Sequence, residues 1–562
     1  MYILGLNLIH DTSAALIKDG QIIGAIEEER LNGQKHTDNF PIQSIEWLLR
    51  EASIKISDVD HVVTSFEFEK FKNNKNPFEE NTNMNDDASP EGRLEIQKDN
   101  ETLYKKVKQS LRQHGIHKWT DINHHLSHAA GGYFLSGFKE TNILVVDGRG
   151  ENVSTSLYYA KGLNINLIED YSISDSLGQL YTYVTKLCGL YTYRGQEGKT
   201  MGLSPYGKHH KELHDIFSEI ITFNEKDYTI NRTNMRKLEK YSRENGQIDE
   251  ISQALAYHVQ QLYEKALKFI VSNLTKMTGC KNLVLSGGVA LNCKGNGSLL
   301  ENKLVDNLYV QPAANDGGTS LGAALYYFHS VLQNKIENKY QTDVYLGPRF
   351  SNEKILQILD TYKIPYKKSE NIALDTANLL ADGNIIAWFQ GAMEFGPRAL
   401  GNRSILADPR DARMKDKINK NVKFREPWRP FAPSILMDYA VNYFEDVIES
   451  PHMTVSFRVK EEMRNIIPAA VHIDGTARIQ TVSKSNNLRY YELLNYFYQI
   501  TGVPVLLNTS FNGPEPMVCS PRDAIRTFFS SGLEFLILGD FIIKKPVLSN
   551  KNFCSEQLVL TK

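Results

Sequence analysis

The stretch Tyr2-Ile3-Leu4-Gly5-Leu6-Asn7-Leu8 opens the pattern that decides the fold. It is mostly apolar, and two further apolar runs follow at residues 13–17 and 22–26, separated by the turn Lys18-Asp19-Gly20-Gln21. Short apolar runs bounded by turn residues predict strands, and the Asp-Gly turn predicts a hairpin. A similar order recurs from residue 142, where a strand-like run ends in Asp147-Gly148-Arg149-Gly150 and residues 157–160 form a second apolar run. The recurrence predicts a duplicated α/β unit.

Polar stretches divide the rest of the chain. Residues 68–103 are rich in Asn, Glu, Lys and Asp, which predicts a solvated surface insertion. Residues 251–279 have helical periodicity, and residues 281–285 form a buried strand that runs into a Gly-Gly turn. The polar residues 334–339 and the breaker Gly347-Pro348 predict a domain boundary near residue 345. We therefore expect a first domain at 1–345 and a second at 346–562, which begins with a helix at 374–382 and a strand at 385–389.

Composition narrows the functional class. The 562 residues include 64 basic and 66 acidic side chains, a formal net charge of −2, so overall charge gives no support for nucleic-acid binding. No run approaches the roughly 18 apolar residues of a membrane helix, and the N-terminal residues lack the pattern of a signal peptide. The five cysteines are scattered without C-x-x-C spacing, which argues against a disulfide framework or a zinc ribbon. We expect a cytoplasmic protein that binds neither membranes nor nucleic acids.

A histidine pair is the first candidate for chemistry. In His124-His125-Leu126-Ser127-His128, the outer histidines are four residues apart, so on a helix they share a face and can bind one metal. Helix capping or simple surface exposure is the alternative. Two loop acids, Asp147 and Asp316, favour a metal, although each alone is more typical of a turn. Two imidazoles with carboxylates suit Fe²⁺, Mn²⁺ or Zn²⁺ and leave positions open for a substrate.

Glycine turns are the second candidate. Ser286-Gly287-Gly288-Val289-Ala290-Leu291-Asn292 follows a strand and precedes an expected helix, where backbone N–H groups could face a nucleotide. A tight strand-to-helix turn is the more typical explanation of a bare Gly-Gly. Residues 193–200 end like a phosphate-binding loop, but Tyr193 replaces the first glycine of that motif, so we reject that interpretation.

A basic stretch at residues 398–429 is the third candidate. Arg398, Lys423 and Arg429 stand in turn-like contexts, where cations suit phosphate, whereas the basic residues of 411–420 are typical of a solvated helix. The apolar run at 505–507 then leads into Asn508-Thr509-Ser510-Phe511-Asn512-Gly513, either a ligand rim or an Asn-Gly hairpin. The chain has no Gly-x-Ser-x-Gly motif, so an acyl-enzyme mechanism is not indicated.

Together these segments resemble the O-carbamoyltransferases of the nodulation-factor, cephalosporin and tobramycin type. The long run Met393-Glu394-Phe395-Gly396-Pro397-Arg398-Ala399-Leu400-Gly401-Asn402-Arg403-Ser404 is the most specific match. The other matching stretches span nearly the whole chain in family order: 27–30 with Lys35-His36, 124–128, 146–148, 198–207, 286–292, 314–322, 428–434, 472–480 and 508–513.

The resemblance implies an ASKHA, actin-like duplicated first domain, similar to the tRNA threonylcarbamoyl-transfer enzymes, and a YrdC-like α/β second domain. It also implies two reaction steps. Carbamoyl phosphate and ATP, the latter with Mg²⁺, give carbamoyl-adenylate and pyrophosphate in the second domain. The first domain then moves the carbamoyl group to a hydroxyl of a small-molecule acceptor, a natural product or a sugar, and releases AMP.

The resemblance also assigns roles to residues. His10 matches a family histidine beside the metal, and we expect it to be the base for the acceptor hydroxyl. In the second domain, Lys423 and Arg429 are the expected catalytic cations, because they neutralise charge that develops on phosphate. The metal ligands are expected to be His124, His128, Asp147 and Asp316, with iron as the metal the family implies. The residues expected to bind substrate or nucleotide are Arg398, Arg478, Asn508, Ser510, Lys199, Gly202, Gly287, Gly288 and Asn292.

Two other functions stay open at this level. The first domain alone also fits a tRNA threonylcarbamoyl-transfer enzyme, although the second-half motifs and the balanced charge argue against it. A non-enzymatic nucleotide-binding scaffold would bind ATP without depending on carbamoyl phosphate. The sequence leaves open the acceptor, the choice between O- and N-carbamoylation, the metal and the oligomeric state.

Overall fold

Two five-stranded sheets with the same topology form the first part of the chain. The computed structural model describes residues 1–69, 102, 104–192, 195–335 and 344–546. The first sheet has the order β3-β2-β1-β4-β5, with strands Gln21–Glu27, Ser13–Lys18, Tyr2–Asn7, His61–Thr64 and Thr120–Asp121. The second has the order β12-β11-β6-β7-β8, with strands Asn307–Val310, Asn282–Ser286, Glu140–Val146, Val153–Lys161 and Asn164–Ser172.

The strand directions of the two sheets also match. In each, the first strand of the unit (β1 or β6) pairs antiparallel with the next strand and parallel with a strand that follows a helical crossover. The third strand of each unit closes an antiparallel hairpin on the second. The predicted duplicated α/β unit is therefore confirmed, and with it the actin-like character expected of the first domain.

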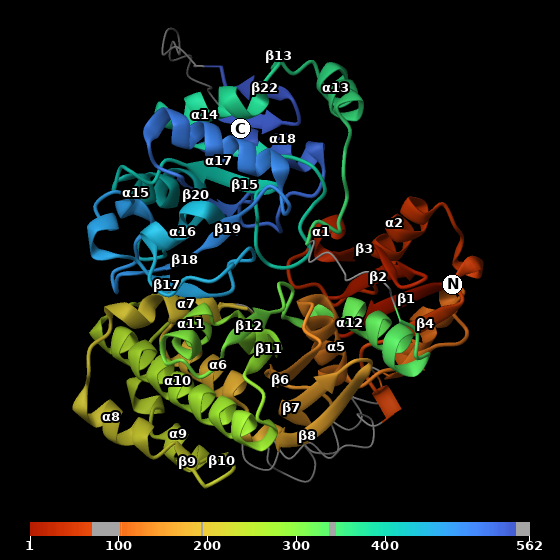
Figure 1. The fold of residues 1–562 in the computed structure, drawn as a ribbon, viewed down its shortest axis with the longest axis vertical. Coiled ribbons are helices and arrows are strands. Elements are labelled where there is room, and N and C mark those ends of the chain that lie inside the picture. Colours follow the sequence, from red (N-terminus) through yellow and green to blue (C-terminus); the bar gives the residue numbers. More distant parts are fainter. Residues whose placement is uncertain (70–101, 103, 193–194, 336–343, 547–562) are drawn as a thin grey trace, which may run out of the picture.

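Two helices lie against each other between the sheets, α5 (His124–Ser136) and α12 (Thr319–Tyr326) (Figure 1). Glycine allows their close approach, because a Cβ on Gly322 would lie 1.9 Å from the carbonyl oxygen of Ser127. The long helix α10 (Glu250–Thr278) covers the other face of the second sheet, and Asp249 caps its first turn. This packing brings the start of α5 and the start of α12 to one place.

The second part of the chain is built on an eight-stranded mixed sheet, in the upper half of Figure 1. Its order is β13-β22-β21-β14-β15-β20-β16-β19, with strands Lys367–Lys368, Phe541–Lys544, Phe535–Leu538, Ile386–Phe389, Arg403–Ala407, Val505–Ser510, Ala432–Leu436 and Gln480–Val482. Helices α14 (Ile372–Ala381) and α17 (Leu488–Thr501) bury an apolar cluster against one face. The α/β fold class expected for this part is confirmed.

Shorter elements complete the fold. The helices are α1 (Glu29–Asn32), α2 (Ile42–Ala52), α6 (Leu177–Leu187), α7 (Glu197–Leu203), α8 (Lys211–Ser218), α9 (Arg232–Arg236), α11 (Cys293–Glu301), α13 (Asn352–Thr361), α15 (Met414–Ile418), α16 (Met437–Tyr443) and α18 (Pro521–Phe529). Two small hairpins pair β9 (Ile221–Phe223) with β10 (Tyr228–Ile230) and β17 (Ser456–Arg458) with β18 (Thr476–Arg478).

Local predictions can be compared with these bounds. The expected helix at 251–279 and strands at 281–285 and 385–389 correspond to α10, β11 and β14. The helix expected at 411–420 is shorter in the structure, where α15 spans Met414–Ile418. A π-helical turn, Asn419–Lys423, follows it directly. Apart from its ends, the polar insertion at 68–103 lies outside the described residues. In the ranges that the structure describes, no helix is long and apolar enough to cross a membrane.

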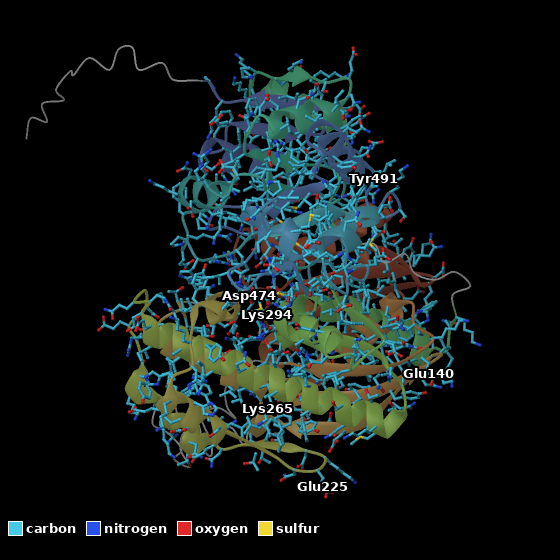
Figure 2. All side chains as sticks on the ribbon, turned by 60° about the vertical axis from the view of Figure 1, so that its left-hand side comes forward. Glu140, Glu225, Lys265, Lys294, Asp474 and Tyr491 are labelled. Carbon is cyan, nitrogen blue, oxygen red and sulfur yellow. The ribbon has the colours of Figure 1, made fainter. Side chains whose placement is uncertain are left out.

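Helix α11 joins the two parts of the molecule. Asn296 Nδ2 donates to the carbonyl oxygen of Thr454 at 2.8 Å, and Ser456 Oγ donates to that of Cys293 at 3.1 Å. Lys294 forms an ion pair with Asp474, and Figure 2 labels both at this junction. These contacts hold the first turn of α11 against the β17–β18 hairpin.

Candidate active sites, a buried histidine-carboxylate cluster and a cationic cavity

Four predicted ligands meet in the first part of the chain. His124 and His128 lie on the first two turns of α5, Asp147 follows β6, and Asp316 stands at the turn before α12. Asp147 Oδ2 lies 3.2 Å from His124 Nε2 and 3.5 Å from His128 Nε2. Asp316 Oδ1 lies 3.7 and 3.6 Å from the same two nitrogens. All four residues are buried, and one ligand atom of each lies within 4.8 Å of the others.

Backbone groups orient this cluster. Gly148 N and Gly288 N donate to Asp147 Oδ1 at 2.8 and 3.3 Å, which leaves Oδ2 to face the imidazoles. The side chain of Asn123 caps α5, and Glu151 accepts from the backbone N–H of His124 at 2.8 Å. The Nε2 of His128 is buried and has no hydrogen-bond partner within the described part of the chain. An orphaned imidazole nitrogen among carboxylates fits a divalent metal ion.

Charge is concentrated here. Burial opposes the imidazolium of His124, but the carboxylates of Asp316 and Asp147 outweigh it and raise its pKa to about 9. Burial likewise opposes the Asp147 carboxylate, but the two imidazoles hold its pKa well below the ordinary value. His125 points elsewhere: its Nδ1 lies 2.7 Å from Ser156 Oγ, and burial holds its pKa well below the ordinary value, so it is neutral.

His10 stands at the open side of the cluster. Its Nε2 lies 3.2 Å from Asp316 Oδ2, and its side chain is 40% exposed, so it can contact both the cluster and a ligand arriving from solvent. Asp11, next in sequence, bonds His36 Nδ1 at 2.8 Å. Asp11, Glu29 and His36 form a second group with ligand atoms within 4.8 Å of one another. In the sequence, residues 27–30 and Lys35-His36 matched the family motif, but no role was predicted for them.

A cavity of about 200 Å³ contains the second group of predicted residues. Its polar lining comes from both parts of the chain: Gly202 on α7, Lys294 on α11, and Arg398, Arg425, Arg429, His472, Arg478, Asn508 and Ser510 from the second part. Arg425, Lys294 and His472 were not predicted. Arg425 belongs to the basic stretch 398–429, and the sequence does not distinguish it from the solvated basic residues of α15. Only the fold places it in the cavity lining.

Cations outnumber anions around the cavity. Arg429 pairs with Glu426 at 3.7 Å and Lys294 with Asp474, but within the described residues no carboxylate pairs with Arg398, Arg425 or Arg478. Burial, together with the neighbouring guanidinium groups of Arg478 and Arg429, lowers the pKa of Arg398 to about 9. Burial and Arg429 also lower the pKa of Arg425 to about 9. Among the described residues, Arg398 Nε finds no hydrogen-bond partner. Clustered, partly unpartnered guanidinium groups fit a phosphorylated ligand, whose charge relieves their repulsion.

Two predicted lysines stand behind the cavity wall. Lys423 Nζ donates to the carbonyl oxygen of Ser510 at 2.6 Å and to Asn512 Oδ1 at 2.6 Å, so it ties down the 508–513 loop. Burial and the neighbouring guanidinium groups hold its pKa well below the ordinary value. Lys199 on α7 pairs with Glu426 at 3.2 Å and thereby links the two parts of the molecule.

The predicted glycine turn lies between the two sites. Gly287 has a φ of 88°, and a Cβ there would lie 2.2 Å from the carbonyl oxygen of Val146, so only glycine fits. Gly288 donates its backbone N–H to Asp147 Oδ1 of the histidine-carboxylate cluster. Asn292 is engaged internally: it caps α11 through Gly295 N at 3.0 Å and exchanges two hydrogen bonds with Gln260 at 2.9 and 3.1 Å.

Comparison with known proteins identifies the family. The model named "Carbamoyltransferase N-terminus" matches residues 2–325, and the model named "Carbamoyltransferase C-terminus" matches residues 377–545. The chain belongs to the carbamoyltransferase family. It is an enzyme of that class, as its resemblance to the nodulation-type carbamoyltransferases indicated.

Relatives of this carbamoyltransferase match along most of its length. Nodulation protein NolNO of Sinorhizobium fredii is 37% identical over 97% of this chain and 80% of its own. Uncharacterized protein MJ1051 of Methanocaldococcus jannaschii is 31% identical over 97% of this chain and 99% of its own. Among solved structures, full-length HypF in its phosphate- and nucleotide-bound form is 13% identical and covers 58% of this chain and 55% of its own, with a TM-score of 0.35.

Proposed function

We propose that this carbamoyltransferase is an ATP-dependent O-carbamoyltransferase that works in two steps at two sites. The observation that carries the proposal is the coexistence, in one carbamoyltransferase chain, of a buried cationic cavity and a separate histidine-carboxylate cluster. The first suits phosphates, and the second suits activation of a carbonyl and a hydroxyl. We assign the steps to a second domain, 346–562, and a first domain, 1–345, respectively.

The first step forms carbamoyl-adenylate. Its atom balance requires one water: carbamoyl phosphate, water and ATP give carbamoyl-adenylate, pyrophosphate and phosphate. Water bonds to the phosphorus of carbamoyl phosphate, the P–O bond to the carbamate breaks and phosphate leaves. A carbamate oxygen then displaces pyrophosphate from the α-phosphorus of ATP, which enters with Mg²⁺. Arg398, Arg429 and Arg478 bind the phosphates and neutralise the charge that grows on the leaving groups. Lys423 holds the Ser510 loop against the substrate.

The second step transfers the carbamoyl group. The oxygen of an acceptor hydroxyl attacks the carbamoyl carbon, the bond from that carbon to the oxygen of the AMP phosphate breaks, and AMP leaves. His10 accepts the hydroxyl proton at Nδ1, because its Nε2 faces the Asp316 carboxylate at 3.2 Å and therefore carries a proton, and its side chain lies at the open side of the cluster. Gly287 and Gly288 allow the AMP portion to approach the backbone. Gly202 lies beside Trp428 and Pro430 of the second domain, and Lys199 pairs there with Glu426.

His124, His128, Asp147 and Asp316 are the residues that would hold a divalent metal. The metal, when bound, would supply Lewis acidity toward the carbamoyl carbonyl. The ligand set accepts Fe²⁺, our first choice, as well as Mn²⁺ or Zn²⁺. The exposed side chain of His10 and the formal net charge of −2 favour a small-molecule hydroxyl as the acceptor, rather than a nucleic acid.

The test is pyrophosphate release from ATP, with and without carbamoyl phosphate and with no acceptor present. We expect release only with carbamoyl phosphate, accompanied by an equal amount of phosphate. Release that ignores carbamoyl phosphate, in folded and metal-loaded protein, would overturn the proposal. Protein stripped of its cluster metal by a chelator, freed of the chelator and then supplied with Mg²⁺ and ATP, should retain this half-reaction and lose transfer to any acceptor.

A further inference from the structure

One carboxylate, that of Glu426, stands between the cationic cavity and the first part of the chain. Its Oε2 lies 3.7 Å from Arg429 Nη1, and its Oε1 lies 3.2 Å from Lys199 Nζ. Arg429 lines the cavity, whereas Lys199 belongs to α7 in the first part. A single carboxylate is therefore shared between a cation of the ligand site and a cation of the other domain.

The two ion pairs of Glu426 differ in geometry. The oxygen that faces Arg429 is buried and has no hydrogen-bond partner among the described residues, because 3.7 Å exceeds hydrogen-bond distance. The oxygen that faces Lys199 lies within that distance. Burial raises the pKa of Glu426, but its own backbone N–H and the two cations lower the pKa more, so the carboxylate is ionised at pH 7. Glu426 thus attracts Arg429 by charge alone, without a hydrogen bond.

Arg429 has no second counter-charge. In the ranges that the structure describes, Glu426 is the one carboxylate that pairs with Arg429. The side chain of Arg429 is 34% exposed, so it can turn toward a ligand in the cavity. A phosphate offers a guanidinium two charge-assisted hydrogen bonds, which Glu426 does not offer at 3.7 Å. A phosphorylated ligand and Glu426 therefore compete for the same cation.

The first part of the chain holds the other partner of Glu426 in place. Lys199 lies on α7, which borders the second part (Figure 1), and its side chain is only 16% exposed. A Cβ on Gly202 of the same helix would lie 3.6 Å from the ring of Trp428. Tyr206 Oη donates to the carbonyl oxygen of Trp428 at 3.4 Å. This contact between the domains fixes how much of the charge of Glu426 is already neutralised.

We propose that Glu426 is a positioning residue that lowers the affinity of the cavity for phosphate by holding Arg429, and that Lys199 limits this effect from the first domain. The inference rests on the proposed function, because it takes the cavity to be the site of carbamoyl phosphate and ATP. When a phosphate binds, Arg429 exchanges Glu426 for the ligand, and Glu426 keeps Lys199 as its partner. When phosphate or pyrophosphate leaves, Glu426 pairs with Arg429 again, which favours product release.

Two simpler roles would give different results. If Glu426 only shaped the turn that carries Arg429, its loss would weaken ligand binding, because Arg429 would be misplaced. If Lys199 bound the ligand directly, its loss would weaken binding whether or not Glu426 is present. Competition predicts instead that loss of the Glu426 charge strengthens binding and that Lys199 acts only through Glu426, which a double-mutant cycle measures.

The experiment measures the affinity of the full-length protein for phosphonoacetamide, a stable phosphonate analogue of carbamoyl phosphate, by calorimetric titration. In Glu426→Gln, which keeps the shape of the side chain and removes its charge, the ligand should bind about 3- to 30-fold more tightly. In Lys199→Met it should bind about 3- to 10-fold more weakly. Lys199→Arg keeps the charge and should restore the affinity. The double variant with Glu426→Gln and Lys199→Met should match Glu426→Gln alone.

A matched control separates a local effect from a change in overall charge. Glu492→Gln removes an exposed carboxylate on α17 and should leave the affinity unchanged. Weaker or unchanged binding in Glu426→Gln would overturn the competition, and Glu426→Met replaces that variant, with the same expectation, if it does not fold. A further loss on adding Lys199→Met to Glu426→Gln would overturn the indirect role of Lys199.

The same titration separates this inference from the proposed function. If phosphonoacetamide fails to bind the unsubstituted protein and all its variants, the cavity's role in the proposed function is contradicted. If phosphonoacetamide binds and Glu426→Gln does not strengthen it, only the role of Glu426 is contradicted.

Discussion

The pH dependence of metal binding tests the electrostatics of the histidine cluster. An imidazole must lose its proton before it can bind a metal. Without metal, the carboxylates of Asp316 and Asp147 raise the pKa of His124 to about 9 against the effect of burial. At pH 7, which is about two units below this pKa, the metal must therefore displace a proton from the His124 imidazole. That requirement weakens the affinity about 100-fold, or by about 2.7 kcal/mol, relative to the deprotonated site.

The expected signature is a slope. Between about pH 6.5 and 8.5 the affinity should rise about tenfold per pH unit, with about one proton released per metal. An unperturbed histidine, with a pKa of about 6.5, would give a nearly constant affinity over this range. Chelator-treated protein titrated with Mn²⁺, with free Mn²⁺ measured by electron paramagnetic resonance, gives the slope. Titrations in buffers of different ionisation enthalpy count the protons.

A constant affinity over this range, without proton release, would refute the reasoning. His214→Gln, which removes an exposed histidine on α8, should leave the slope unchanged. The same charges also act on folding. Because the pKa of His124 is raised in the fold, its pairing stabilises the metal-free protein fully below about pH 6.5, and this contribution is lost as the pH rises through about 9.

Three further predictions concern the two sites and the backbone between them. Arg429→Ala should abolish pyrophosphate release, whereas His128→Ala should retain it and lose transfer; equal loss of both in a folded His128 variant would argue against two separate sites. Gly287→Ala should destabilise by at least about 2 kcal/mol in urea unfolding, because its φ is 88° and a Cβ would lie 2.2 Å from a backbone oxygen. Gly162→Ala, with a φ of 64° and open space around it, should cost only about 1 kcal/mol, and equal costs would contradict this account. Burial raises the pKa of Asp11, but the neighbouring imidazole lowers it more, to about 2. The Asp11 carboxylate therefore contributes about 2 kcal/mol to the free energy of unfolding above pH 4, and this contribution is lost as the pH falls toward 2. In Asp11→Asn, the free energy of unfolding should depend less steeply on pH in this range. An unchanged midpoint of acid unfolding in Asp11→Asn would contradict this account.

Part of the architecture was predictable because it depends on local pattern. Strand, turn and hairpin signals lie within a few residues of one another, and their recurrence from residue 142 predicted the duplicated unit that the two matching sheets confirm. The spacing of His124 and His128 predicted a shared helix face in the same way. The family also followed from the sequence, because a long motif such as residues 393–404 is specific by its letters alone.

Other features depended on contacts between distant segments. Asp147 and Asp316 were each indistinguishable from an ordinary turn acid, and only the packing of α12 against α5 places both beside the histidines. Lys423, predicted to be a catalytic cation, donates to the carbonyl oxygen of Ser510, because the π-helical turn directs it toward that loop. A single sequence carries no signal for such distances.

The sequence alone thus determined the strands, the repeated unit, the histidine pair and the family, since each is encoded in residues close together along the chain. Tertiary structure alone decided how closely the predicted carboxylates approach the histidines and which way the buried side-chain amides of Gln480 and Asn508 point. The orientation of Asn508 depends on a backbone carbonyl at Leu400, reached through Gln480 on another strand. Hydrogen-bond direction is a property of the assembled network, because each donor must find an acceptor that the fold places opposite it.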